Sequence, residues 1–199
     1  MQNCLDYNLL CLVHGIAWTA FLSARLILRK PAPGQPAIRK SQTSHASSYS
    51  AALIAFHGVG FGVMYHGIAQ ARNTTTDRYL FLPLAPLGAL VILSGAALMC
   101  WAMSYFRSWR LHAKIDTGHE LATGGPFAWL RHPIYAGIDL LAIGTVLWLP
   151  TQTEMLAVLL LIIGSDLRAR AEEIVLVKAF GETYTTYMAR TKRFIPGLY

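Results

Sequence analysis

Charged residues are scarce in this chain of 199 residues: Asp, Glu, Lys and Arg make up 14%, whereas hydrophobic residues make up 54%. Ordinary soluble domains carry about 25% charged residues, so the composition excludes a typical soluble protein. Cysteine is scarce too. The three cysteines, Cys4, Cys11 and Cys100, lie in or beside apolar runs, which excludes a secreted fold held together by disulfides.

Long apolar runs are what the sequence has instead. Five can be marked, at residues 5–28, 51–69, 80–105, 133–149 and 155–167 with its continuation. A helix crosses a bilayer in about 20 residues, so five crossings leave no room for a separate nucleotide-binding domain. The sequence therefore predicts an all-α, polytopic membrane protein with five transmembrane helices. Any active site must be built from helix ends and loops.

Acidic residues are outnumbered by basic ones, 10 to 17, and the basic residues are placed unevenly. Only Arg72 and Arg78 follow the second run. The other fifteen follow the first, third and fifth runs, as Arg25, Arg29, Lys30, Arg39, Lys40, Arg107, Arg110, Lys114, Arg131, Arg168, Arg170, Lys178, Arg190, Lys192 and Arg193. Because Lys and Arg gather on the cytoplasmic side of membrane proteins, we expect the N-terminus outside and the C-terminus in the cytoplasm. The net charge of +7 then requires no nucleic acid as a partner.

The same distribution divides the chain into two expected parts. Residues 1–106 hold the first three transmembrane helices and a basic cytoplasmic loop at 29–50, and residues 107–199 hold a loop, helices four and five and a cytoplasmic tail. In a prokaryote the protein would lie in the inner membrane, with its active site on the cytoplasmic side. The sequence leaves the oligomeric state open.

Two features of the first two runs favour helix packing over a ligand site. Alternating glycines that include Gly58 and Gly62 lack the strand context of a dinucleotide-binding loop, so we interpret these two as close packing positions. His14, His57 and His66 have no identifiable facing partners for a metal or haem. We expect them to make hydrogen bonds between helices, and we assign no metal site.

The boundaries of the last two helices can be placed from the sequence. Pro133 fits the first turn of a helix and pushes the residue before it out of helical conformation, so helix four should begin there. The fifth run continues without Gly or Pro to Phe180, and Gly181 is a natural C-terminal residue. The short link between helices four and five makes them antiparallel neighbours whose cytoplasmic ends lie side by side.

Two polar clusters meet at those ends. Arg131 and His132 lie at the positive N-terminal end of helix four, which suits a carboxylate or phosphate. Glu172 and Glu173 on helix five can accept hydrogen bonds from hydroxyl or amino groups. Together they describe a pocket for a small zwitterionic ligand that contains a sugar. Simpler interpretations stay open: the first pair can fix topology only, and Arg168 with Glu172 has the spacing of a surface ion pair.

The joint pattern resembles the isoprenylcysteine carboxyl methyltransferase family. It consists of Gly-His-x-Leu-x-x-x-Gly-x-Phe-x-Trp-x-Arg-His-Pro-x-Tyr from residue 118, then Arg168-x-x-x-Glu172-Glu173, then Phe-Gly-Glu-x-Tyr-x-x-Tyr from residue 180. The resemblance covers residues 118 to about 196, and the small size is similar to prokaryotic members. It implies an integral-membrane methyltransferase that uses S-adenosylmethionine and releases S-adenosylhomocysteine.

Carried over position by position, the resemblance implies a cofactor site and a substrate site. The cofactor site comprises His119, Glu120, Leu121, Ala122, Phe127, Arg131, His132, Pro133, Ile134, Tyr135, Glu172 and Glu173. Ala122 replaces the usual valine and Phe127 a common tyrosine. Arg168 would position the substrate carboxylate as the catalytic residue. Because that carboxylate is already ionised at neutral pH, no general base is required, and catalysis would consist of alignment and removal of water.

The acceptor implied by the resemblance is lipophilic and would enter sideways between helices, most simply as a prenylated cysteine. Asp139 lies at membrane depth and either pairs with an arginine or histidine of a neighbouring span or lines the acceptor site. Asp166 should pair with Arg170, one turn on. Alternative functions are methylation of a phospholipid amine or a small thiol, an NADPH-dependent membrane reductase, and a non-enzymatic membrane subunit.

Overall fold

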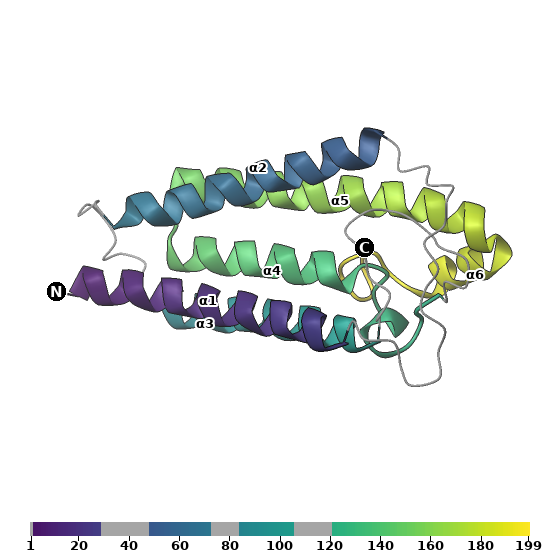
Figure 1. Cartoon of the computed structure of the whole chain (residues 1–199), viewed down its shortest axis with the longest axis horizontal. Coiled ribbons are helices and arrows are strands. Elements are labelled where there is room, and N and C mark those ends of the chain that lie inside the picture. Colours follow the sequence, from purple (N-terminus) through teal and green to yellow (C-terminus); the bar gives the residue numbers. More distant parts are fainter. Residues whose placement is uncertain (1, 29–47, 73–83, 106–120) are drawn as a thin grey trace.

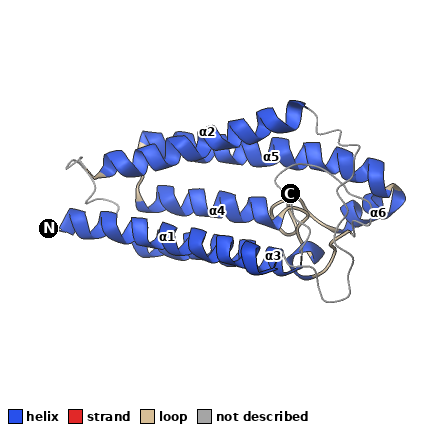
Figure 2. Ribbon diagram, viewed as in Figure 1, coloured by secondary structure: helices blue, strands red, loops and turns tan. Residues whose placement is uncertain are grey.

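A computed structural model describes residues 2–28, 48–72, 84–105 and 121–199. The described elements are all helical, as predicted (Figure 2). They are α1 (Gln2–Leu28), α2 (Ser48–Ala71), α3 (Ala85–Tyr105), the 3-10 helix η3 (Gly125–Ala128), α4 (Pro133–Trp148), α5 (Gln152–Phe180) and α6 (Glu182–Arg190).

The five long helices form an elongated bundle, and successive helices run in opposite directions along it (Figure 1). α3 packs along α4 and α1, while α2 packs along α5, which also contacts α4. The N-terminus lies at one end of the bundle and α6 lies at the other (Figure 1). We call the second end the α6 end. It holds the N-terminus of α4 and the last turns of α5.

The sequence-based boundaries of α4 and α5 are confirmed. Pro133 occupies the first turn of α4, where its missing N–H costs nothing. α5 begins after Thr151, whose side chain accepts a hydrogen bond from the Glu154 backbone N–H at 3.2 Å. It continues for 29 residues and ends at Gly181, which has a φ of 54°. That left-handed conformation favours glycine and lets α6 leave in a new direction.

Helix packing through glycine occurs, but not where the sequence analysis placed it. The predicted packing positions Gly58 and Gly62 were wrong: among the described residues nothing lies within 4 Å of a Cβ added to either. α2 instead meets α5 through Gly60, where an added Cβ would lie 3.0 Å from the Leu161 side chain. Neighbours at i+2 point away from the packed face of a helix, and this explains the error. Among the described residues, the closest approach of an added Cβ to another helix backbone joins α3 to α4, where a Cβ on Gly95 would lie only 2.5 Å from the Gly137 carbonyl.

Within the part of the chain that the structure describes, three helices are long and apolar enough to cross a membrane, namely residues 7–28, 50–71 and 85–105. α4 is apolar but shorter, at 16 residues. The first half of α5 carries exposed apolar side chains, including Leu156, Leu159 and Ile162. Exposed apolar surface of this kind suits contact with lipid. The count of five crossings and their orientation stay predictions.

The scattered histidines behave differently from one another. His14 lies 3.2 Å from Tyr65 Oη and 3.0 Å from Thr145 Oγ1, so it joins α1 to α2 and α4, as expected. His66 lies 2.6 Å from Gln70 Nε2, so its hydrogen bond among the described residues is within α2 and not between helices as predicted. His57 was predicted to make similar bonds, and that was wrong: in the described part of the chain neither ring nitrogen has a hydrogen-bond partner. Its neighbours on α2, α4 and α5 are aromatic rings and a glycine.

Candidate active site

The segment before α4 is held in place by the C-terminal tail. The Arg131 N–H donates to the Lys192 carbonyl at 2.7 Å, and the Lys192 N–H donates to the Trp129 carbonyl at 3.1 Å. The His132 N–H donates to the Arg193 carbonyl at 3.2 Å. This short parallel bridge ties residues 129–132 to a tail some 60 positions later, and so presents Arg131 and His132 toward α5.

Glu173 lies in a cage of cations at this end of the bundle. The residue is 5% exposed. Its carboxylate accepts from Arg131 Nε at 2.8 Å and from Arg193 Nη2 at 2.7 Å, and His132 Nε2 lies 3.3 Å away. Burial alone would raise the pKa of the Glu173 carboxyl, but hydrogen bonds from His132, Arg193 and Arg131 hold it well below its usual range. The carboxylate therefore stays ionised, with its oxygens engaged by the protein.

Glu172, the neighbouring residue, has different surroundings. Its side chain is 23% exposed. One oxygen accepts a hydrogen bond from Tyr135 Oη, and the other lies 3.7 Å from His132 Nδ1. The imidazole of His132 thus stands between the two glutamates and faces each with one ring nitrogen. Glu172 keeps accessible surface on which its carboxylate can accept further hydrogen bonds.

Arg168 and Tyr135 complete the cluster one turn deeper in the bundle. The Arg168 guanidinium lies over the Tyr135 ring, 5.0 Å from its centroid, and the residue is 7% exposed. Tyr135 is 3% exposed and its ring stacks between those of His132 and His57, at centroid distances of 5.7 Å and 6.0 Å. The arrangement brings a buried cation, a phenol and the partly accessible Glu172 onto one side of the α4–α5 contact.

The remaining predicted residues are placed as follows. Pro133 and Ile134 are buried in the first turn of α4, and among the described residues no side chain caps that turn. Phe127 is buried in η3, and its carbonyl accepts from Tyr187 Oη at 2.7 Å. Leu121 and Ala122 are half-buried just before η3. The predicted residues His119 and Glu120, and most of the loop 29–50, lie outside the described residues.

Asp139 is buried between α4 and α5, where its carboxylate accepts a hydrogen bond from Ser165 Oγ at 2.7 Å. In the described part of the chain its partner is thus a serine, and the ion pair that the sequence suggested as one alternative is not seen. Asp166 pairs with Arg170 at 2.6 Å, as predicted, and also with Arg193 at 3.1 Å. Arg193 of the C-terminal tail therefore pairs with both Asp166 and Glu173 of α5.

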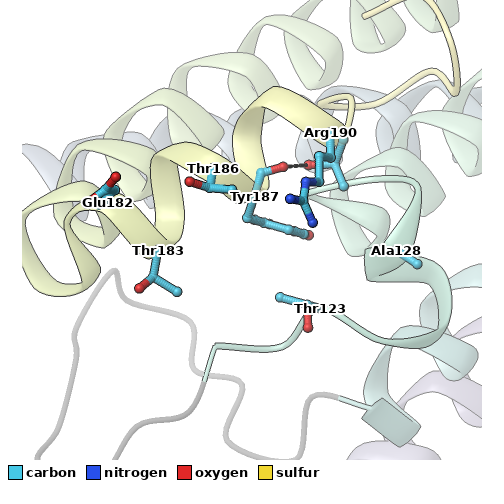
Figure 3. A pocket seen from close by; sticks show the side chains of 8 residues that line it. Thr123, Ala128, Glu182, Thr183, Thr186, Tyr187 and Arg190 are labelled. Carbon is cyan, nitrogen blue, oxygen red and sulfur yellow. Dashed lines mark hydrogen bonds between the residues drawn. The ribbon is translucent and has the colours of Figure 1, made fainter.

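A cavity of about 590 Å³ opens beside this cluster, between α6 and the segment that leads into η3 (Figure 3). It is lined by Thr123, Ala128, Glu182, Thr183, Thr186, Tyr187, Arg190 and Thr191. Burial raises the pKa of Tyr187 to about 12, so its hydroxyl stays a hydrogen-bond donor. Arg131 connects this wall to Glu173, because its Nη1 donates to the carbonyls of Met188 and Thr191.

Sequence reasoning missed Arg193 and the α6 wall of the cavity. Arg193 was counted only among the basic residues that set orientation, although it holds Glu173 and Asp166. The missed lining residues include Thr183, Thr186 and Arg190, which recur at three- and four-residue spacing on one face of α6. This helical spacing, beside the family pattern around Tyr184 and Tyr187, could have indicated that these residues line one surface.

Comparison with known proteins assigns the chain to a family. The family model described as phospholipid methyltransferase matches residues 84–183, from the start of α3 to the start of α6. This chain belongs to the phospholipid methyltransferase family. The matched region contains Arg131, His132, Tyr135, Arg168 and both glutamates, so the part of the chain that carries the polar cluster is the part that family membership rests on.

Curated relatives of the chain are isoprenylcysteine methyltransferases, which confirms the predicted resemblance. The chain is 35% identical over 119 residues to protein-S-isoprenylcysteine O-methyltransferase of Homo sapiens and of Rattus norvegicus. The match to each covers 57% of this chain and 41% of the relative. With the Schizosaccharomyces pombe protein of the same name it is 34% identical over 85 residues, covering 42% of this chain and 36% of that protein. The chain thus spans about two fifths of the length of these relatives.

The fold is shared with a solved structure. This is the eukaryotic intramembrane Ras methyltransferase ICMT (isoprenylcysteine carboxyl methyltransferase), matched with a TM-score of 0.63 at 23% identity. The match covers 99% of this chain and 68% of that one. Together with the apolar helices, it makes this family member an integral membrane protein.

Proposed function

We propose that this chain transfers a methyl group from S-adenosylmethionine to the carboxylate of a prenylated cysteine. The observation that carries the proposal is the placement of Glu172 and Arg168 on successive turns of α5, on either side of the Tyr135 contact. A partly accessible acid and a buried cation are the two groups that a sugar-containing methyl donor and an anionic acceptor require. The family membership and the curated relatives support the same chemistry.

The residues at the α6 end fit S-adenosylmethionine. Glu172 has an accessible carboxylate that suits the two ribose hydroxyls. The first turn of α4, for which no capping side chain is found among the described residues, offers N–H groups to the methionine carboxylate. The 590 Å³ cavity has the size of a small-ligand site, but it lies between α6 and the segment before η3, and neither Glu172 nor the first turn of α4 lines it. When bound, the cofactor supplies an activated methyl group on a positively charged sulfur.

The protein's own contribution is to position the acceptor and to exclude water from it. Arg168 binds one carboxylate oxygen, and its burial keeps water from competing for the same group. The Tyr135 hydroxyl donates to Glu172 and so couples the α4 wall to the cofactor-binding acid. No side chain has to remove a proton, since a carboxylate is ionised at neutral pH. Alignment of two bound reactants can supply several kcal/mol.

We place the α6 end at the cytoplasmic side of the membrane, with five crossings and the N-terminus outside. Support comes from the basic residues Arg168, Arg170, Lys178, Arg190, Lys192 and Arg193, which all lie toward that end. The opposite directions of successive helices agree with this orientation (Figure 1). A lipophilic acceptor then reaches Arg168 laterally from the inner leaflet, and residues 107–199 act as the cofactor-binding region.

A phospholipid amine is the second candidate acceptor, because the matching family is described by phospholipid methylation. The buried Arg168 disfavours it, since a cationic amine headgroup would be repelled at the same place. One assay distinguishes the two candidate acceptors. Radiolabelled methyl transfer is measured to N-acetyl-S-farnesylcysteine and to phosphatidylethanolamine in mixed micelles, and we expect transfer to the first.

Cofactor binding is tested by titrating the detergent-purified protein with S-adenosylhomocysteine in a calorimeter. We expect Glu172→Gln to abolish binding. Glu154→Gln is the matched control, because Glu154 lies at the other end of the same helix and should leave the affinity unchanged. Binding of NADPH in place of S-adenosylhomocysteine would support the reductase alternative, and binding of neither would contradict the methyltransferase proposal.

A further inference from the structure

His57 is a buried polar residue that the fold leaves unsatisfied. It is 3% exposed, and in the described part of the chain both ring nitrogens are buried without a hydrogen-bond partner. His14 is equally buried in the same bundle, yet both of its nitrogens lie within hydrogen-bond distance of partner hydroxyls. Leaving a buried polar group unpaired destabilises a fold. The bundle gives His14 two hydrogen-bond partners, so the missing partners of His57 require an explanation.

The imidazole of His57 adjoins the proposed active site. Its ring stacks on Tyr135 at a centroid distance of 6.0 Å and an interplanar angle of 27°, and on Phe61 at 5.9 Å. His57 lies on the face of α2 that packs along α5. Gly164 of α5 makes room for the ring: an added Cβ there would lie 3.1 Å from His57 Nδ1. Nδ1 thus faces a helix backbone, and Nε2 is the other nitrogen that is unpaired among the described residues; both are buried in the fold.

The order of residues along α5 places His57 on the acceptor side. Gly164, Arg168 and Glu172 occupy successive turns of one helix face, about 6 Å apart along the axis. Glu172 is nearest the α6 end, where the cofactor is proposed to bind. Arg168 follows, and Gly164 with His57 lies deepest in the bundle. A lipophilic acceptor whose carboxylate reaches Arg168 from the membrane therefore passes His57.

We infer that His57 is an acceptor-binding residue, whose Nε2–H donates to the acceptor carboxylate beside Arg168. This rests on the proposed function. A carboxylate oxygen can accept two hydrogen bonds, so Arg168 and His57 together hold the oxygen that does not attack. The second oxygen forms the new C–O bond to the methyl carbon, while the S–CH₃ bond breaks and its electron pair stays on sulfur. No proton moves, and the neutral imidazole acts only as a donor.

The test compares two substitutions that differ in hydrogen bonding. His57→Phe keeps an aromatic ring for the stack on Tyr135 but removes both nitrogens, whereas His57→Gln keeps a donor near the position of Nε2. For N-acetyl-S-farnesylcysteine we expect His57→Phe to raise KM and to lower kcat/KM about 10- to 100-fold, the worth of a hydrogen bond to a charged group. His57→Gln should recover at least a third of the wild-type kcat/KM.

Two further measurements separate binding from structure. The affinity for S-adenosylhomocysteine should stay within twofold in both variants, because His57 lies away from Glu172. The Tm of His57→Phe should equal or exceed that of the wild type, since an unpaired polar group is removed from an apolar site. Saturating N-acetyl-S-farnesylcysteine should raise the Tm of the wild type but not of His57→Phe.

The possible results bear on the inference separately from the proposed function. An unchanged KM and kcat/KM in an active His57→Phe would overturn the role of His57 and leave the methyltransferase intact. A Tm several degrees lower, or a parallel loss of S-adenosylhomocysteine affinity, would also overturn it by showing a structural role. A wild type that binds S-adenosylhomocysteine but methylates only phosphatidylethanolamine would overturn both the carboxylate acceptor and its contact with His57.

Discussion

The cage around Glu173 and the open cluster around Glu172 are built from adjacent residues of one helix, yet they differ in what they leave accessible. Glu173 is surrounded by Arg131, His132 and Arg193, and its side chain is 7% exposed. Glu172 is contacted by Tyr135 and His132, and its side chain is 23% exposed. The difference indicates a division of labour. Glu173 stabilises the fold by pairing with converging cations, whereas the Glu172 carboxylate keeps surface that can accept further hydrogen bonds.

Removing the caged acid should have the largest effect. Glu173→Ala leaves Arg131 and Arg193 nearly buried without their carboxylate, and removing one partner of a buried ion pair costs about 3–5 kcal/mol. We expect a large fall in the free energy of unfolding, measured by thermal or denaturant unfolding in detergent. Glu172→Ala is the matched control and should cost less, about 1–3 kcal/mol, because it leaves the buried Tyr135 hydroxyl without its acceptor but unpairs neither arginine of the cage. Equal losses in the two variants would contradict the division.

Acid should erase the stability that the cage provides. The Glu173 pKa is lowered from its ordinary value of 4.5 in the folded protein, so its contribution is complete above that pH and is lost as the pH falls below it. We expect the Tm difference between wild type and Glu173→Gln to be largest near neutral pH and to shrink progressively below about pH 4.5. A difference that is constant across this range would show that the charge of Glu173 is not what stabilises the fold.

The hydroxyl of Tyr135 should matter for ligand affinity more than for stability. Tyr135→Phe keeps the stack with His132 and His57 but removes the donor to Glu172. Because this hydroxyl orients the Glu172 carboxylate of the proposed cofactor site, and a preoriented group binds at lower cost, we expect S-adenosylhomocysteine affinity to fall roughly tenfold in calorimetry. Tyr187→Phe, which loses a bond to a backbone carbonyl on the cavity wall, is the control. A larger loss of affinity in Tyr187→Phe would indicate that the cofactor contacts α6 and not Glu172.

The smallest effect is expected for the exposed ion pair outside both clusters. Arg170 pairs with Asp166 at 2.6 Å, but its side chain is 55% exposed, and solvent screens such pairs. Arg170→Gln should leave both Tm and S-adenosylhomocysteine affinity unchanged. Arg193→Gln, which removes a cation from the cage, should lower Tm clearly in the same assay. If Arg170→Gln proves as damaging as Arg193→Gln, burial is not what distinguishes the two arginines.

Local features were predictable from the sequence. The start of α4 at Pro133 and the end of α5 at Gly181 follow from backbone chemistry that does not depend on the rest of the fold. The pairing of Asp166 with Arg170 follows from helical spacing. The meeting of the Arg131–His132 segment with Glu172 and Glu173 also followed, because a short link forces α4 and α5 to be antiparallel neighbours.

Contacts that depend on helix rotation were not predictable. Gly58 and Gly62 were expected to pack, but α2 turns Gly60 toward α5 instead. Arg193 was read as a charge that sets orientation, although it reaches Glu173 from a tail that no local pattern connects to α5. His57 was grouped with His14, and only the packed bundle shows that one is satisfied and the other is not.

The sequence by itself determined a helical membrane protein with its polar clusters at one end, because low charge, long apolar runs and clustered basic residues can be recognised along the chain without knowing how the helices pack. Only the tertiary structure decided which of the two adjacent glutamates is caged. Successive residues on a helix point about 100° apart, so Glu172 and Glu173 face different neighbours. Those neighbours, Tyr135 on one side and Arg131 with Arg193 on the other, come from distant parts of the chain.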